Sequence, residues 1–164
     1  MSDAAGYSRT QILLHWGTVL LVALQYLLHG GVATAYDRAV ETGDYAVTLP
    51  VALHAAGGMA ILLLATARLL LRKEHGTPPP PEGEPPLFQK LGHGTHLAFY
   101  GLLFLLPVTG AAAWGGQMAG ASTAHEVLKT VLLILIIAHV GAVALHQWVW
   151  KTGLIRRMTV PRPE

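Results

Sequence analysis

The sequence predicts an all-α fold: an integral membrane bundle of four helices in a single domain, residues 1–164. Three observations support this. Four long runs are almost entirely apolar, 52% of all residues are hydrophobic, and only 12% are charged, about half of the 25% usual in soluble domains. A helix that crosses the hydrocarbon core needs about 20 apolar residues. Too little polar sequence remains to cover four such runs in water.

The four predicted membrane spans follow one another through short connections. They cover residues 11–29, 45–71, 91–114 and 122–150. The connection 31–44 is polar, and the connection 72–90 contains the run TPPPPEGEPP, which proline excludes from a helix. Residues 115–121 form a glycine-rich turn. Pro107 lies inside the third span and predicts a kink, which neighbouring helices make tolerable.

Lys and Arg side chains gather at one side of the predicted bundle. Nine of the eleven flank span ends on that side, namely Arg9, Arg68, Arg72, Lys73, Lys90, Lys151, Arg156, Arg157 and Arg162. Arg38 and Lys129 fall on the other side. Because positive charge marks the cytoplasmic side, both termini and the proline-rich connection are expected in the cytoplasm. The net charge of +2 is too small to indicate binding of nucleic acid.

Seven of the nine histidines fall within the predicted spans, where a polar side chain is costly and usually functional. They are His15, His54, His93, His96, His125, His139 and His146. Acidic partners are nearly absent from the spans, so a metal is the expected partner of these imidazoles. The absence of cysteine excludes iron–sulfur clusters and thiolate zinc sites.

The spacing of the histidines indicates two metal levels. His125 and His139 are 14 residues apart, so they share a helix face and lie about 21 Å apart. Because successive helices run in opposite directions, the depth of each histidine in the membrane can be compared. His54 lies at the depth of His125, and His15 lies at the depth of His139. Two imidazoles per level suit the axial positions of haem iron, whereas zinc takes three or four ligands. The alternative interpretation is a haem-free protein whose histidines bond between helices or line a transporter or proton path.

The remaining polar residues of the spans are candidates for contacts with cofactors. His146 lies about 32 Å from His125 along the helix, which makes it a poorer ligand and a better surface residue. We expect six residues to form hydrogen bonds or ion pairs with a quinone head group or with haem propionates. They are His93, His96, His146, Arg9, Arg68 and Arg72.

The chain resembles the prokaryotic cytochrome b561 family of four-helix, di-haem membrane cytochromes over nearly its whole length. The resemblance rests on YSRTQILLHW, LHAAGGMAILLLATARLLLR, LGHGTHLAFYGLLFLLPVTG, and AHEVL with AHVGAVALHQWVWKTGLIRRM. Ligands in that family lie on the first, second and fourth helices. Carried over, this implies two b haems with the iron ligands His15, His54, His125 and His139. The third-helix pair His93 and His96 stays outside the ligand set.

The resemblance implies that the protein transports electrons in the respiratory chain of a bacterial inner membrane. The electrons would pass from a periplasmic donor to ubiquinone. The protein is expected to be a monomer or a homodimer. One member resembles a superoxide oxidase, and steering of that anion requires positive charge, for which Lys129 and Arg38 are the candidates. Ser122 and Thr123 stand where such members carry a basic residue in a longer loop, which counts against superoxide.

Two functions therefore remain open. The protein is either an enzyme, a superoxide:ubiquinone oxidoreductase, or an electron carrier that serves a membrane or periplasmic dehydrogenase and has no substrate of its own. In either case no catalytic side chain is expected, apart from the groups that protonate the quinone.

Overall fold

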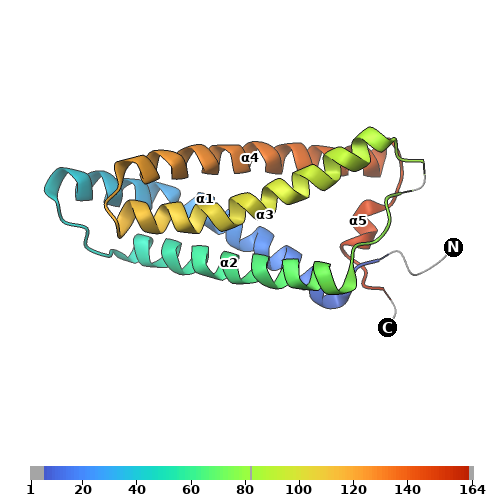
Figure 1. Ribbon diagram of the computed structural model, residues 1–164, viewed down its shortest axis with the longest axis horizontal. Coiled ribbons are helices and arrows are strands. Elements are labelled where there is room, and N and C mark those ends of the chain that lie inside the picture. The colour runs from blue at the N-terminus through green and yellow to red at the C-terminus, as the bar shows by residue number, and fades with distance from the viewer. Residues whose placement is uncertain (1–5, 82, 163–164) are drawn as a thin grey trace.

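The computed structural model describes residues 6–81 and 83–162, and this part of the chain is all-helical (Figure 1). The helices are α1 (Arg9–Thr42), α2 (Leu49–His75), α3 (Pro86–Trp114), α4 (Ala119–Trp148) and the short α5 (Leu154–Arg157). The first four are long and apolar enough to cross a membrane. The predicted fold class is confirmed.

The four long helices alternate in direction along the bundle (Figure 1). Residues 6–8 and 158–162, α5 and the described part of the proline-rich connection, residues 76–81 and 83–85, lie at one end, which we call the terminal end. The connections 43–48 and 115–118 lie at the opposite end. α1 packs along α2 and α3 packs along α4, while α2 and α3 join these two pairs. The nine cations that flank one side in the sequence therefore lie toward the terminal end.

Local sequence explains where the helices begin. Ser8 and Gln11 form a capping box at the start of α1: the Ser8 hydroxyl accepts from the Gln11 amide at 3.2 Å, and the Gln11 side chain accepts from the Ser8 amide at 3.0 Å. Pro50 and Pro86 lie in the first turns of α2 and α3, where the missing amide hydrogen leaves no bond unmade.

The predicted polar connection at residues 31–44 is wrong over most of its length, because α1 continues to Thr42. Residues 32–42 contain neither glycine nor proline, so nothing stops the helix. Gly43 then adopts a φ of 73°, a left-handed conformation that ends helices and favours glycine. A helix of 34 residues reaches about 51 Å, well beyond the hydrocarbon core of about 30 Å, so its last part is polar although it is helical.

The other boundaries differ from the predicted spans by fewer residues. α2 begins at Leu49 instead of residue 45, and α3 begins at Pro86 instead of residue 91. α3 is continuous through Pro107, and near it the Thr109 hydroxyl donates to the carbonyl oxygens of Leu105 and Leu106 at 3.0 Å each.

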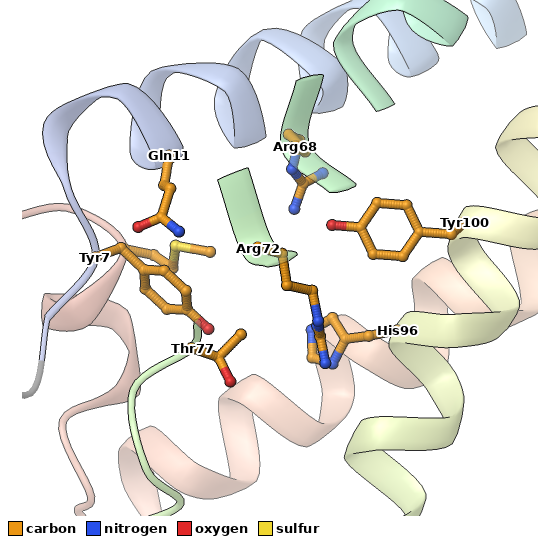
Figure 2. A pocket seen from close by; sticks show the side chains of 8 residues that line it. Tyr7, Gln11, Arg68, Arg72, Thr77, His96 and Tyr100 are labelled. Atoms are coloured by element: carbon orange, nitrogen blue, oxygen red, sulfur yellow. The ribbon is translucent and has the colours of Figure 1, made fainter. Parts of the chain in front are cut away.

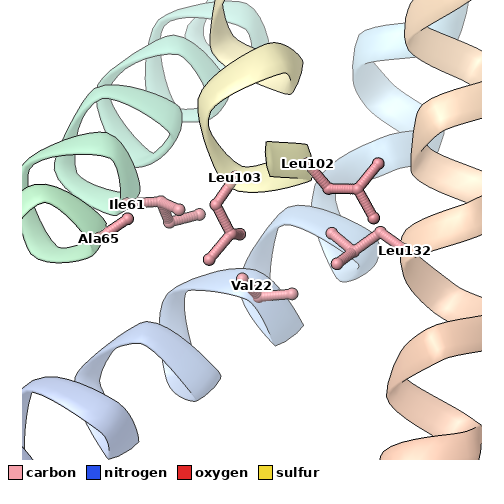
Figure 3. Close-up of a cluster of buried hydrophobic side chains, with 6 residues drawn as sticks. All are labelled: Val22, Ile61, Ala65, Leu102, Leu103 and Leu132. Carbon is pink, nitrogen blue, oxygen red and sulfur yellow. The ribbon is translucent and has the colours of Figure 1, made fainter. Parts of the chain in front are cut away.

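Six buried apolar side chains fill the middle of the bundle (Figure 3). This central cluster consists of Val22, Ile61, Ala65, Leu102, Leu103 and Leu132. Leu132 is seven residues from both His125 and His139, about 10 Å along α4 from each. The central cluster therefore separates two histidine levels. The outer surface is apolar as well, since Leu27 and Ile137 expose 79% and 65% of their area, as expected for side chains that face lipid.

The absence of native cysteine allows a direct test of orientation by single cysteines. We expect Glu41→Cys, exposed at the end of α1, to react with a membrane-impermeant maleimide in intact spheroplasts. Glu74→Cys, exposed near the end of α2, should react only after lysis if the terminal end lies in the cytoplasm, as the excess of cations predicts. Labelling of Glu74→Cys before lysis would reverse the predicted orientation.

Candidate functional site

His54 of α2 and His125 of α4 face one another toward the opposite end of the bundle. Their ring centroids are 6.1 Å apart, with the ring planes at 69°. A metal bonds an imidazole nitrogen at about 2 Å, and the ring centre lies about 1 Å behind that nitrogen. Two rings on opposite sides of one ion are thus centred about 6 Å apart. The spacing of this pair fits the two axial positions of one haem iron.

Hydrogen bonds determine which nitrogen of His125 is available. Its Nδ1 lies 3.0 Å from the Leu106 carbonyl oxygen and 3.1 Å from the Thr109 hydroxyl. A carbonyl only accepts, so Nδ1 carries the hydrogen and Nε2 keeps its lone pair. Metal-ligating histidines have this arrangement. Gly110 gives the ring room, because a Cβ there would lie 3.2 Å from Cε1 of His125.

Three imidazoles come together on the other side of the central cluster. The ring of His139 on α4 lies 5.6 Å from the rings of both His96 and Phe99 on α3. His96 donates from Nδ1 to the Gly92 carbonyl at 2.7 Å, which leaves its Nε2 as a lone-pair nitrogen. His15 of α1 is near enough to both to interact electrostatically. The predicted level of His15 and His139 thus contains His96 as a third imidazole.

Arg68 forms a hydrogen bond with Nδ1 of His15. The Arg68 guanidinium donates to Nδ1 of His15 at 3.1 Å, so in this arrangement the neutral imidazole carries its hydrogen on Nε2. Axial ligation through Nε2 requires the other tautomer, and Arg68 would then need another acceptor. A haem propionate is an acceptor of suitable charge.

Arg68 also lines a pocket at the terminal end of the bundle (Figure 2). The pocket lies among the N-terminal segment, α2, α3 and the C-terminal segment. Its lining consists of Tyr7, Gln11, Arg68, Arg72, Thr77, His96, Tyr100 and Met158. Two guanidinium groups and two phenols point into one space, which suits a ligand with carboxylate or carbonyl oxygens.

Tyr7 enters this pocket as a neutral hydrogen-bond donor. Burial raises the pKa of its phenol, and this effect exceeds the opposing effect of the nearby Arg72 and Arg157. The phenol therefore keeps its proton at neutral pH. Of the other predicted contacts, His93 is exposed and lies 3.4 Å from Arg72, and Arg9 is exposed at the start of α1.

The prediction that His146 is a surface residue is wrong. Its side chain is 8% exposed and its Nε2 lies 3.3 Å from a carboxylate oxygen of Glu84, which is 9% exposed. Its Nδ1 lies 3.1 Å from the Thr152 hydroxyl, and the Trp150 ring packs edge-on at 4.5 Å. The connection 76–85 and the segment after α4 fold over this end of α4 and bury His146. Both imidazole nitrogens of His146 are therefore engaged with protein groups.

The two predicted anion-steering residues do not form one positive surface. Lys129 donates to Glu126 at 2.6 Å and contacts Nε2 of His29 at 2.9 Å. Arg38 is exposed nine residues beyond His29 on α1, about 13 Å further along the helix. The nearby Glu126 offsets the charge of Lys129.

Comparison with known proteins identifies the family. Residues 6–160 match the family model described as prokaryotic cytochrome b561. The chain belongs to this family. It is 33% identical to cytochrome b562 of Cereibacter sphaeroides over 162 residues, which cover 99% of this chain and 100% of the relative. It is 27% identical to cytochrome b561 homolog 1 of Escherichia coli (strain K12) over 177 residues, which cover 95% and 97%.

Membership confirms the resemblance seen in the sequence. The protein is a b-type cytochrome that binds haem b and transfers electrons in a bacterial membrane, which it crosses several times. The imidazole pair of His54 and His125 and the free Nε2 of His125 are compatible with this cofactor.

Several residues of this cytochrome's polar sites were not singled out in the sequence. Tyr7 and Tyr100 line the pocket, Thr109 bonds His125, and Glu84 faces His146. For Glu84 the available signal was its place among the acidic residues of the proline-rich connection, with no indication of its partner. Gln25 was the most visible signal, as an amide inside an otherwise apolar span.

The contact between Glu84 and His146 predicts a stability effect. We expect Glu84→Ala to lower the free energy of unfolding in detergent by about 3 kcal/mol, because it leaves a buried imidazole without its partner. Glu74→Ala is the matched control, since Glu74 is 72% exposed, and should change stability by less than about 0.5 kcal/mol. Equal effects of the two variants, measured by thermal or denaturant unfolding, would contradict the structural role of Glu84.

Proposed function

We propose that this cytochrome carries electrons across the bacterial inner membrane from a periplasmic donor to ubiquinone, with two b haems as cofactors. His54 and His125 would hold the haem toward the opposite end, and His15 and His139 the haem toward the terminal end. Haem iron with both axial positions filled supplies one-electron redox chemistry. The protein's part is to hold the two groups at fixed depths in an apolar interior and to tune them.

The facing rings of His54 and His125 are the observation that carries the proposal. Their 6.1 Å spacing and the lone pair on Nε2 of His125 support one bis-imidazole level. The second level is supported by His139, 14 residues along the same face of α4, with His15 and His96 nearby. The apolar central cluster lies between the two levels.

His15 is the proposed partner of His139, although the ring of His96 also lies close to that of His139, at 5.6 Å. His15 agrees with the family pattern on the first helix, and its present hydrogen bond from Arg68 links it to a cation suited to a propionate. Arg72 lines the same pocket and would serve the second propionate. His96 would then contribute its Nε2 to the pocket as a hydrogen-bonding group.

The terminal-end pocket is the proposed site of ubiquinone reduction. Reduction of a quinone requires two protons as well as two electrons, so its carbonyl oxygens need neutral donors. Tyr7 and Tyr100 supply phenol hydrogens, and the raised pKa of Tyr7 keeps its proton in place at neutral pH. The pocket is at the terminal end, where the excess of cations supports a cytoplasmic location.

A periplasmic electron carrier or dehydrogenase is the proposed donor. Steering of superoxide would need unpaired positive charge near His54 and His125. Lys129 is bonded to Glu126 there, and Arg38 lies further along α1. Purified protein that oxidises superoxide as it reduces ubiquinone, with no added partner, would reinstate superoxide as the donor.

The ligand assignment predicts the haem content of five variants. Parent protein should bind about two haems per chain, measured by pyridine haemochrome. His54→Ala and His125→Ala should each retain about one haem, and His15→Ala and His139→Ala should retain the other one, distinguished by its reduced-minus-oxidised spectrum. His96→Ala should retain both.

Two outcomes would change the assignment. Retention of two haems by His125→Ala and His139→Ala would overturn it altogether. Loss of one haem from His96→Ala, with both retained by His15→Ala, would assign the ligand of the terminal-end haem to α3 instead of α1.

The quinone site predicts a kinetic effect of Tyr7. In stopped flow, we expect the dithionite-reduced protein to be reoxidised by a short-chain ubiquinone about tenfold more slowly after Tyr7→Phe, because the phenol proton is lost. Tyr36→Phe at the opposite end is the control and should react at the parental rate. Equal rates for both variants would place quinone reduction elsewhere.

A further inference from the structure

Gln25 is a polar side chain within the apolar part of α1. It lies ten residues beyond His15, about 15 Å along the helix. Its Oε1 is buried without a hydrogen-bond partner in the part of the chain that the structure describes. An amide inside a membrane span is costly unless it serves a bonding or functional role.

His54 has the complementary unpaired atom. Its Nδ1 is buried and lacks a hydrogen-bond partner among residues 6–81 and 83–162. When Nε2 of a histidine binds a metal, Nδ1 carries the hydrogen, and in nearly all such sites it donates to an oxygen. His125 already has this arrangement through Leu106 and Thr109. His54 is the member of the pair without an acceptor.

Gln25 reaches α2 one turn from His54. Its side-chain amide lies against Gly57, where the amide nitrogen takes the space that a Cβ would fill, and Oε1 is 3.9 Å from that Cβ position. Residues three apart share a helix face, so the amide and the His54 ring are on the same side of α2. Glycine at 57 is what allows the amide to approach.

We infer that Gln25 is a positioning residue for His54, with its Oε1 accepting the Nδ1 hydrogen when Nε2 binds iron. This rests on the proposed function, since it concerns one of the proposed ligands. The hydrogen bond would select the ligating tautomer and fix the ring orientation. It would also make Nε2 a stronger electron donor, which favours the oxidised iron and lowers the reduction potential.

The test compares redox titrations and low-spin electron paramagnetic resonance spectra of Gln25→Leu, Gln25→Glu and the parent. The haem of His54 is identified as the one lost in His125→Ala. In Gln25→Leu, its reduction equilibrium should shift about tenfold toward the reduced form, equal to 59 mV for one electron, and its largest g value should change. Gln25→Glu, which keeps an acceptor oxygen, should have a potential at or below that of the parent.

Gln147→Leu is the matched control. The Oε1 of Gln147 is also buried and unpartnered among the described residues, but Gln147 lies near the terminal end of α4. Its substitution should leave the potential and the spectrum of the His54 haem unchanged.

The outcomes separate this inference from the proposed function. Two haems with parental potentials and spectra in Gln25→Leu overturn the role of Gln25 and leave the ligands intact. Loss of the His54 haem from Gln25→Leu supports the inference if Gln25→Glu retains it, and overturns it if both variants lose it. A parent protein that binds no haem at this level overturns the proposed function instead.

Discussion

Imidazoles that face one another across the space between two helix pairs are the interaction on which the rest of this structure depends. α1 packs along α2 and α3 along α4, and the two pairs meet chiefly through α2 and α3. His54 and His125 belong to different pairs, as do His15 and His139. A group ligated at both levels would therefore tie the two pairs together. Cofactor binding and bundle stability are thus linked, as in other proteins in which a metal supplies part of the folding free energy.

A seven-residue repeat organises the levels. On α4, His125, Leu132, His139 and His146 follow one another at intervals of seven residues. Seven residues are nearly two turns, so these side chains share one face, as in the left-handed packing of helix bundles. The face alternates between a proposed ligand and an apolar residue of the central cluster before it ends in the buried His146.

The same interval recurs on the helices that supply the partners. On α1, Val22 lies seven residues after His15, and on α2, Ile61 lies seven residues after His54. Both are members of the central cluster (Figure 3). This is why counting residues along the sequence sufficed to pair His54 with His125 by depth. The apolar central cluster lies in the interval between the levels that electrons would cross.

The features that the sequence predicted depend on local patterns, whereas the features that it did not predict depend on contacts between distant segments or on limits of hydropathy. Four apolar helices and the pairing of His54 with His125 depend on hydropathy and helix period, which are local. The burial of His146 depends on how the connection 76–85 folds back to place Glu84 on it, which no local rule contains. The extension of α1 to Thr42 was missed because hydropathy detects the membrane-spanning part of a helix and not the helix itself.

Long-range contacts also build the asymmetry between the two ends. The Trp16 indole donates to the Met158 carbonyl at 2.8 Å, and Arg157 donates to the Pro79 carbonyl at 2.7 Å, so the C-terminal segment is held across the terminal end. Met158 of this segment lines the pocket together with Arg68 and Arg72 (Figure 2). At the opposite end, Lys129 is offset by Glu126. Stabilisation of anionic groups is therefore concentrated at the terminal end, which favours that end for propionates and for the negative charge that forms on a quinone as it is reduced.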